Sequence, residues 1–126
     1  MPTGTVRIKN NTTYTPTLEN IALANCNWLY TQELHDGDPI ANNGLKQGTV
    51  DIAGMAFADY RIDLHVRFYG PPPGTHDVIL QMGRDDNGQM AFVGTGANST
   101  DLFDVDWAHV LGGPTDDIFV ITISPK

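Results

Sequence analysis

The sequence contains one cysteine and two serines, and both scarcities exclude functional classes. Cys26 has no second cysteine to pair with, whereas small secreted domains normally depend on several disulfides. We therefore expect the chain to fold in a reducing compartment or to leave the cell without a disulfide framework, with Cys26 as a small buried side chain. The two serines, Ser99 and Ser124, lie in no Gly-x-Ser-x-Gly motif, which disfavours a serine hydrolase.

Basic residues are also few. Seven Lys and Arg stand against fifteen Asp and Glu, which gives a net charge of −8 and an isoelectric point near 4.5. Affinity for nucleic acid comes mainly from basic side chains that neutralise phosphates, so a nucleic-acid partner is disfavoured. An acidic surface keeps a soluble domain dispersed.

Long hydrophobic runs are absent. No apolar stretch reaches the ~18 residues of a membrane-spanning helix. Met1-Pro2-Thr3-Gly4 leads directly into a strand-like segment, with no basic n-region or apolar h-region of a signal peptide. We expect a protein without a transmembrane segment that is cytoplasmic or secreted by a non-classical route, and that meets a membrane only from outside.

The sequence is rich in turn residues, and in several segments apolar and polar residues alternate with a period of two. In residues 61–68 the side chains of Ile62, Leu64, Val66 and Phe68 share one face, and the residues between them are polar. Thirteen Gly and eight Pro indicate many short connections. A length of 126 residues fits a single domain, 1–126. We predict an all-β fold, an antiparallel β-sandwich of short strands with at most one or two short helical turns.

Other segments carry the same signals. Asp86-Asn87-Gly88 predicts a hairpin turn, and two short helical turns are expected at 21–24 and 104–111. Residues 118–123 are apolar at nearly every position, which predicts a strand covered on both faces. The further strand candidates are 6–9, 17–23, 28–32, 49–52, 77–82 and 90–93.

The acidic residues are unevenly distributed. Thirteen of the fifteen are Asp, and the candidate metal ligands are Asp101, Asp104, Asp106, Asp116 and Asp117. Clustered Asp side chains in loops can supply the six to eight oxygens that Ca²⁺ needs. Asp is also a favoured turn residue because it caps nearby backbone amides, so solvated turns are the alternative interpretation.

One short segment combines carboxylates with an imidazole. Asp104, Asp106 and His109 lie within six residues, a combination that a divalent-metal hydrolase can use. A surface or capping histidine is the alternative for His109. His65 lies on the polar face of 61–68 beside Asp63 and Arg67, where a solvated cross-strand cluster is expected. No nucleophile or phosphate-binding motif accompanies these residues, and we expect a binding protein rather than an enzyme.

The aromatic residues lie mostly beside turn-rich segments. Tyr and Trp at loop tips suit a membrane interface or a sugar face, since each has an apolar body and a polar edge. Phe68 is expected in the core, and Tyr69 either covers a sheet edge or contacts a ligand. The candidate lipid-binding residues are Trp28, Tyr30, Tyr69 and Trp107.

The order of these features resembles the aegerolysins, small acidic β-sandwich proteins that include the smaller partners of two-component toxins. The resemblance is carried by residues 5–12 (TVRIKNNT), 47–52 (QGTVDI), 62–71 (IDLHVRFYGP) and 119–123 (FVITI). It implies recognition of sphingolipid-containing membranes through aromatic loops, recruitment of a larger pore-forming protein in a haemolysin-like toxin, and no catalytic residue.

The sequence is therefore compatible with two alternative binding functions. The first is a lipid-binding module of aegerolysin type that uses no cofactor. The alternative is a calcium-dependent, lectin-like sandwich that binds glycans through aromatic platforms and the Asp-rich stretch. An apolar 118–123 strand also allows a homo-oligomer that buries one sheet face.

Overall fold

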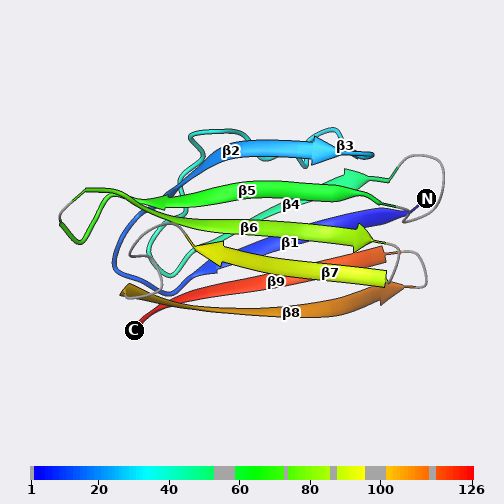
Figure 1. The fold of residues 1–126 in the computed structure, drawn as a ribbon. Coiled ribbons are helices and arrows are strands. Elements are labelled where there is room, and N and C mark those ends of the chain that lie inside the picture. Colours follow the sequence, from blue (N-terminus) through cyan, green and yellow to red (C-terminus); the bar gives the residue numbers. More distant parts are fainter. Residues whose placement is uncertain (1, 53–58, 73, 86–87, 96–101, 114–115) are drawn as a thin grey trace.

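The chain forms a β-sandwich. A computed structural model describes residues 2–52, 59–72, 74–85, 88–95, 102–113 and 116–126, and these residues form two sheets that lie one over the other (Figure 1). The five-stranded sheet has the order β3-β4-β1-β9-β8, and the four-stranded sheet has the order β2-β5-β6-β7. The strands are β1 Thr3–Asn10, β2 Thr17–Ala24, β3 Asn27–Trp28, β4 Leu45–Asp51, β5 Arg61–Phe68, β6 His76–Asp85, β7 Gly88–Thr95, β8 Phe103–Gly113 and β9 Asp116–Pro125.

The predicted all-β sandwich is confirmed, with one feature that the sequence did not indicate. β1 and β9 pair in parallel, from Thr3 opposite Asp116 to Asn10 opposite Ile123, and the other strand pairs are antiparallel. A parallel pair needs a connection that crosses from one end of the sheet to the other. Here the rest of the chain, including the whole four-stranded sheet, makes that crossing, so the first and last strands lie side by side.

Alternation along the strands builds the core. In β5 every second residue is buried and the residues between them are half-buried. β9 shows the same alternation, because one face of each sheet packs on the other sheet. The buried apolar side chains of the two sheets and of their connecting segments form one cluster, whose largest members are Tyr60, Phe68, Phe119, Ile8, Leu18, Ile40, Ile62, Leu64, Leu80, Met82, Ile121 and Ile123.

Aromatic rings close one end of this core. Phe68 stacks on Phe103 with ring centroids 4.2 Å apart, and Tyr14 meets Phe103 edge-on at 6.3 Å. The ring of Tyr14 also lies against Gly70, where a Cβ would come within 2.7 Å of the ring. Phe68 is thus a core residue, as the sequence predicted, and glycine is needed at position 70 for the close approach of Tyr14.

The two expected helical turns are wrong. Residues 21–24 belong to β2 and residues 104–111 belong to β8. In β8 the backbone groups pair with β9 from Phe103 opposite Pro125 to Gly113 opposite Asp116, so tertiary pairing outweighs the local capping signals. The described residues contain no helix long and apolar enough to cross a membrane.

The hairpin expected at Asp86-Asn87-Gly88 joins β6 and β7. Asp85 pairs with Gly88, which leaves a two-residue loop, 86–87, outside the described residues.

The expected strand 28–32 is shorter. Only Asn27–Trp28 is regular, and the following residues stay against β4 through Leu29 N–H to the Thr49 carbonyl and Thr49 N–H to the Gln32 carbonyl.

The expectation that the last strand is covered on both faces is wrong within the monomer. Phe119, Ile121 and Ile123 are fully buried between the sheets. Ile118 and Val120 point to the other side of the five-stranded sheet and are only half-buried. The sequence pattern therefore contains more apolar side chains than the sandwich itself covers.

A buried amide fastens the loops at the end of β1. The Nδ2 of Asn10 donates to the carbonyl oxygens of Tyr14, Ile40 and Ala41 at 2.7, 3.1 and 3.2 Å. Its Oδ1 accepts hydrogen bonds from the backbone N–H and the hydroxyl of Thr12, at 3.0 and 2.6 Å. Asn10 is fully buried. One side chain thus joins the loop between β1 and β2 to the segment between β3 and β4 and satisfies buried backbone groups in both.

Replacing Asn10 by Ala should lower the free energy of unfolding by about 3 kcal/mol, because buried carbonyls lose their donor. The matched control is Asn11→Ala at the exposed neighbouring position, which should change stability by less than about 0.5 kcal/mol. Urea unfolding of the two variants measures the difference. Equal stability of the two variants would show that the Asn10 amide does not hold these loops.

Candidate functional site

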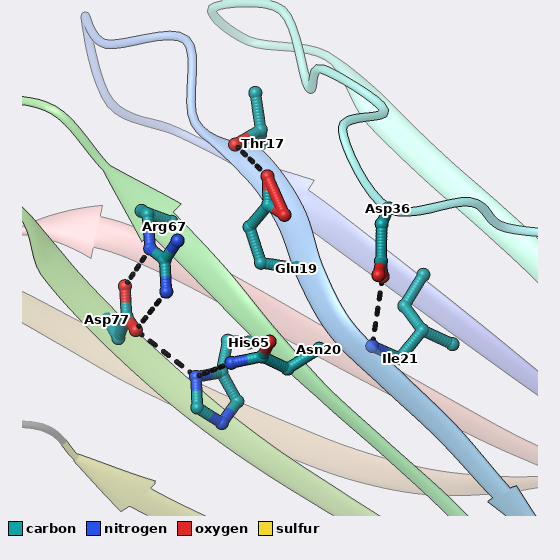
Figure 2. A network of polar contacts seen from close by, with 8 residues as sticks. All are labelled: Thr17, Glu19, Asn20, Ile21, Asp36, His65, Arg67 and Asp77. Atoms are coloured by element: carbon teal, nitrogen blue, oxygen red, sulfur yellow. Dashed lines mark hydrogen bonds and ion pairs between the residues drawn. The ribbon is translucent and has the colours of Figure 1, made fainter.

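The richest polar surface lies on the outer face of the four-stranded sheet. β2, β5 and β6 place it there because alternate residues of each strand point away from the core. Figure 2 shows most of its side chains converging between β2 and β6. We call it the Arg67 cluster, and its members are Thr17, Glu19, Asn20, His65, Arg67, Tyr69 and Asp77.

A bidentate ion pair forms its centre. Arg67 Nε donates to Asp77 Oδ1 at 2.9 Å, and Arg67 Nη2 donates to Asp77 Oδ2 at 3.0 Å (Figure 2). The two residues face each other across the β5–β6 pair. This guanidinium lowers the pKa of the Asp77 carboxyl, burial opposes the shift, and His65 adds to it. The Asp77 carboxylate in turn raises the pKa of Arg67, so both groups stay charged over the physiological range.

His65 extends the pair towards β2. Its Nδ1 lies 3.1 Å from Asp77 Oδ2 and 3.3 Å from the Asn20 amide nitrogen. A ring nitrogen carries either one hydrogen or one lone pair, so Nδ1 serves one of these partners. The shorter, charge-assisted contact with Asp77 is favoured, with Nδ1–H as the donor.

A β-bulge in β2 brings Asn20 to this position. The register against β5 shifts between Glu19 and Ala22, and Asn20 adopts a φ of 53°. Asn tolerates this left-handed conformation better than most residues. The Asp36 carboxylate accepts a hydrogen bond from the Ile21 backbone N–H at 3.0 Å, which holds the bulge in place (Figure 2).

An exposed aromatic side chain stands at the edge of the cluster. Tyr69 follows β5 directly and is 56% exposed. Its hydroxyl lies 2.8 Å from Thr17 Oγ1, which in turn lies 3.3 Å from Glu19 Oε1. The surface therefore combines an accessible ring with a guanidinium, an imidazole and two carboxylates, so it can contact ligand groups of either charge.

A second polar group is buried between the sheets. Asp117 of β9 is fully buried, and both of its oxygens are occupied. Arg84 Nη2 and His109 Nε2 lie 2.7 and 2.8 Å from Oδ1, while Arg84 Nε and the Tyr60 hydroxyl lie 2.8 and 2.7 Å from Oδ2. Because β6 supplies Arg84 and β9 supplies Asp117, this Asp117 network ties one sheet to the other.

The charges of the Asp117 network are set by these contacts. Burial by itself would raise the pKa of Asp117, but hydrogen bonds from Arg84, His109 and Tyr60 lower it below its usual value. Burial raises the pKa of the Tyr60 phenol, and the neighbouring carboxylate adds to the shift. The hydrogen bonds to Asp117 raise the pKa of Arg84. The network thus holds an ionised Asp–Arg pair with a neutral tyrosine.

The four candidate lipid-binding residues do not meet in one place. Trp28 is on β3 and Trp107 is on β8, at opposite edges of the five-stranded sheet. Tyr30, 87% exposed, follows β3, whereas Tyr69 belongs to the Arg67 cluster on the other sheet. Trp107 lies opposite Ile121, on the inner side of β8, and is 46% exposed because β8 is an edge strand.

The candidate metal ligands are also separated. Asp104 and Asp106 point to the outer side of β8, opposite Ser124 and Thr122, whereas Asp116 and Asp117 lie at the far end of β9. The Thr3 hydroxyl donates to Asp116, and Asp117 belongs to the buried network. Asp101 lies outside the described residues. Within the described part of the chain, no three His, Cys, Asp or Glu side chains form a group that could hold a metal ion.

The combination of Asp104, Asp106 and His109 is divided between the two faces of β8. His109 points inwards, opposite Phe119, and its partner is Asp117. The carboxylates of Asp104 and Asp106 are exposed on the other face. The structure therefore does not place the imidazole with the two carboxylates that precede it in sequence.

Sequence reasoning missed Asp77, Arg84 and His76 as partners. Asp77 could have been found from the β5–β6 register, which sets it opposite Arg67. Arg84 and Asp117 fall on the apolar side of alternating strands. Opposite charges at two inward positions indicate a buried ion pair. His76 is buried, and its Nε2 lies 2.7 Å from the Pro71 carbonyl oxygen. No feature of the sequence indicated this contact.

The fold is similar to that of an aegerolysin. No protein-family model matches the sequence, and no curated protein matches it either. Among solved structures, RahU, an aegerolysin-family protein crystallised in complex with a TRIS molecule, matches over 99% of this chain and 96% of its own, with a TM-score of 0.60. The two sequences are 9% identical, so the similarity shows the fold alone.

The Asp117 network predicts a specific acid dependence. Because the folded pKa of Asp117 lies below its unfolded value, near 4, its contribution to stability is present above that pH and is lost as pH falls through the folded pKa. Asp117→Asn should lower the free energy of unfolding at pH 7 by about 3–5 kcal/mol, because Arg84 is left near an uncharged partner. The deficit should shrink as pH falls below about 4.

Denaturant unfolding between pH 2.5 and pH 7 measures this difference. The matched control is Asp104→Asn, an exposed carboxylate on β8, whose stability should follow wild type within about 0.5 kcal/mol. A deficit for Asp117→Asn that stays constant across the whole pH range would show that the ionised form of Asp117 does not stabilise the fold.

Proposed function

We propose that this chain is a non-enzymatic, membrane lipid-binding module that recognises sphingolipid-type headgroups. The observation that carries the proposal is the fold. The structure of this chain aligns with that of RahU, an aegerolysin-family protein, over 99% of its length. The layout of strands in the sequence and the aromatic–proline segment after β5 resemble the same family.

The Arg67 cluster supplies a surface suited to such a headgroup. Zwitterionic headgroups present a phosphate and an ammonium close together. Arg67 offers a phosphate the guanidinium N–H groups that do not bind Asp77, and Glu19 offers a carboxylate to an ammonium. The exposed ring of Tyr69 fits a membrane interface, because it has an apolar body and a polar hydroxyl.

The overall charge favours specific recognition over electrostatic adsorption. The chain carries a net charge of −8, and anionic leaflets repel an acidic protein. Binding must therefore come from direct contacts with the headgroup and from the interfacial aromatic side chain. We expect selectivity for zwitterionic sphingolipid vesicles over vesicles of anionic lipid.

Tyr69→Ala should weaken binding to sphingolipid-containing vesicles by about tenfold, because the exposed ring no longer enters the interface. Vesicle co-sedimentation with and without sphingolipid measures the effect. Tyr30→Ala is the matched control, since Tyr30 is a more exposed tyrosine that follows β3 and lies outside the Arg67 cluster. A loss with Tyr30→Ala and not with Tyr69→Ala would move the binding site to the β3 edge.

The same assay tests the calcium-dependent lectin alternative. EDTA should leave vesicle binding and the melting temperature unchanged, because the proposed contacts use side chains of the protein alone. Loss of binding in EDTA would favour a calcium site. Absence of binding to vesicles of any composition would contradict the lipid-binding function altogether.

We further propose that pore formation, as in two-component toxins, requires a larger partner protein. The chain offers a compact lipid-binding surface and no long apolar helix among its described residues. Vesicles loaded with a fluorescent dye should bind the protein and retain the dye. Dye release by this chain alone would contradict the assignment as the membrane-recognition component.

A further inference from the structure

The outer face of the five-stranded sheet carries an ordered pattern of charge and apolar surface. Strand pairing sets Lys9, Thr122 and Asp106 side by side in one row across β1, β9 and β8. The next row is Arg7, Val120 and Ala108, and the following row is Thr5, Ile118 and Val110. We call this surface the β9 face. Basic side chains lie on β1, the apolar Ile118 and Val120 lie on β9 between Asp116 and Thr122, and acidic and apolar side chains lie on β8.

The charged side chains of the β9 face form no ion pair with any described residue of the monomer. Arg7 Nε donates to the Gln47 amide oxygen, and Lys9 Nζ donates to the Asn43 carbonyl. Asp104 and Asp106 are exposed and take part in none of the ion pairs between described residues. Lys9 and Asp106 share a row but are separated by the full width of β9, about 10 Å across two strand spacings.

The centre of the β9 face is apolar and accessible. Val110 is 47% exposed and Ala108 is exposed, while Ile118 and Val120 are half-buried. The sequence pattern of β9 is that of a strand covered on both faces, yet the sandwich covers only one. Contiguous apolar surface rimmed by charge is characteristic of interaction sites.

We propose that the β9 face packs against the same face of a second copy of this chain. A two-fold axis parallel to β9 and lying in the plane of contact brings β9 over β9 of the partner and β8 over β1 of the partner. Because such an axis preserves the position along the strand, Asp106 of each copy then faces Lys9 of the other. Val120 and Ile118 meet at the centre, in the aligned packing usual for two sheets.

The second copy is favoured over an unrelated partner by this self-complementarity. The basic strand and the acidic strand lie on opposite sides of the apolar strand in matching rows, which is the arrangement that a two-fold contact needs. The contact forms two identical Lys–Asp pairs and places no like charges opposite each other in the Lys9 row. It is independent of the lipid-binding proposal, since the Arg67 cluster is on the other sheet.

Charge reversal and its rescue test the contact. Sedimentation velocity over a concentration series should show wild type reaching twice the 13.7 kDa mass of one chain. Asp106→Lys and Lys9→Glu should each weaken dimerisation by at least about tenfold, since each reversal acts in both symmetric pairs. The double variant Lys9→Glu/Asp106→Lys should restore the dimer, which also shows that the single variants do not act through misfolding.

Glu33→Lys is the matched control, because it makes the same change of net charge at an exposed position in the segment between β3 and β4. It should leave the dimer unchanged. A wild-type chain that remains monomeric at every concentration overturns the proposal. So does a dimer that survives both single reversals, which would place the contact elsewhere, such as the edge strand β8. Failure of the double variant to recover would equally contradict Lys9–Asp106 pairing.

Discussion

The two sheets of this sandwich depend on one buried carboxylate. Asp117 is removed from solvent at the end of β9, and a charged group in that position is tolerated only when its hydrogen bonds are complete. Arg84 from the opposite sheet supplies two of them, and Tyr60 and His109 supply the others. Because Arg84 lies on β6 and Asp117 on β9 of the other sheet, both of these hydrogen bonds form in one relative position of the two sheets. The buried pair therefore specifies how the sheets are aligned.

Much of the fold could be predicted because a strand that is buried on one face alternates apolar and polar residues in its sequence. β5 was located residue for residue as 61–68, and the β6–β7 hairpin followed from its Asn-Gly signal. The segment 104–111 was misread because Asp104 and Gly112 look like helix caps, and local sequence does not show that β9 will pair with it. The parallel pairing of β1 with β9 joins segments more than a hundred residues apart, and no local pattern specifies it.

The candidate site was less accessible to sequence reasoning than the fold. The polar face around His65 and Arg67 was recognised, but its main partner, Asp77, comes from the next strand and depends on the exact register. The nearness of Asp104, Asp106 and His109 in sequence was misleading, since adjacent positions of a strand point to opposite faces. Side chains at consecutive positions of one strand lie on opposite faces of the sheet. The side chains that meet in the Arg67 cluster come from different strands.

The two outer faces of the sandwich have different compositions, which favours different roles for them. The four-stranded sheet carries paired charges that satisfy one another, as Arg67 and Asp77 do, and it is stable in water without a partner. The charged side chains around Ile118 and Val120 on the five-stranded sheet form no ion pair between described residues, and this is the face that gains from being covered. If the β9 faces of two copies meet, the two Arg67 clusters point away from each other. Under the two proposals together, a dimer presents its two lipid-binding surfaces in opposite directions and joins two vesicles, whereas a monomer coats one.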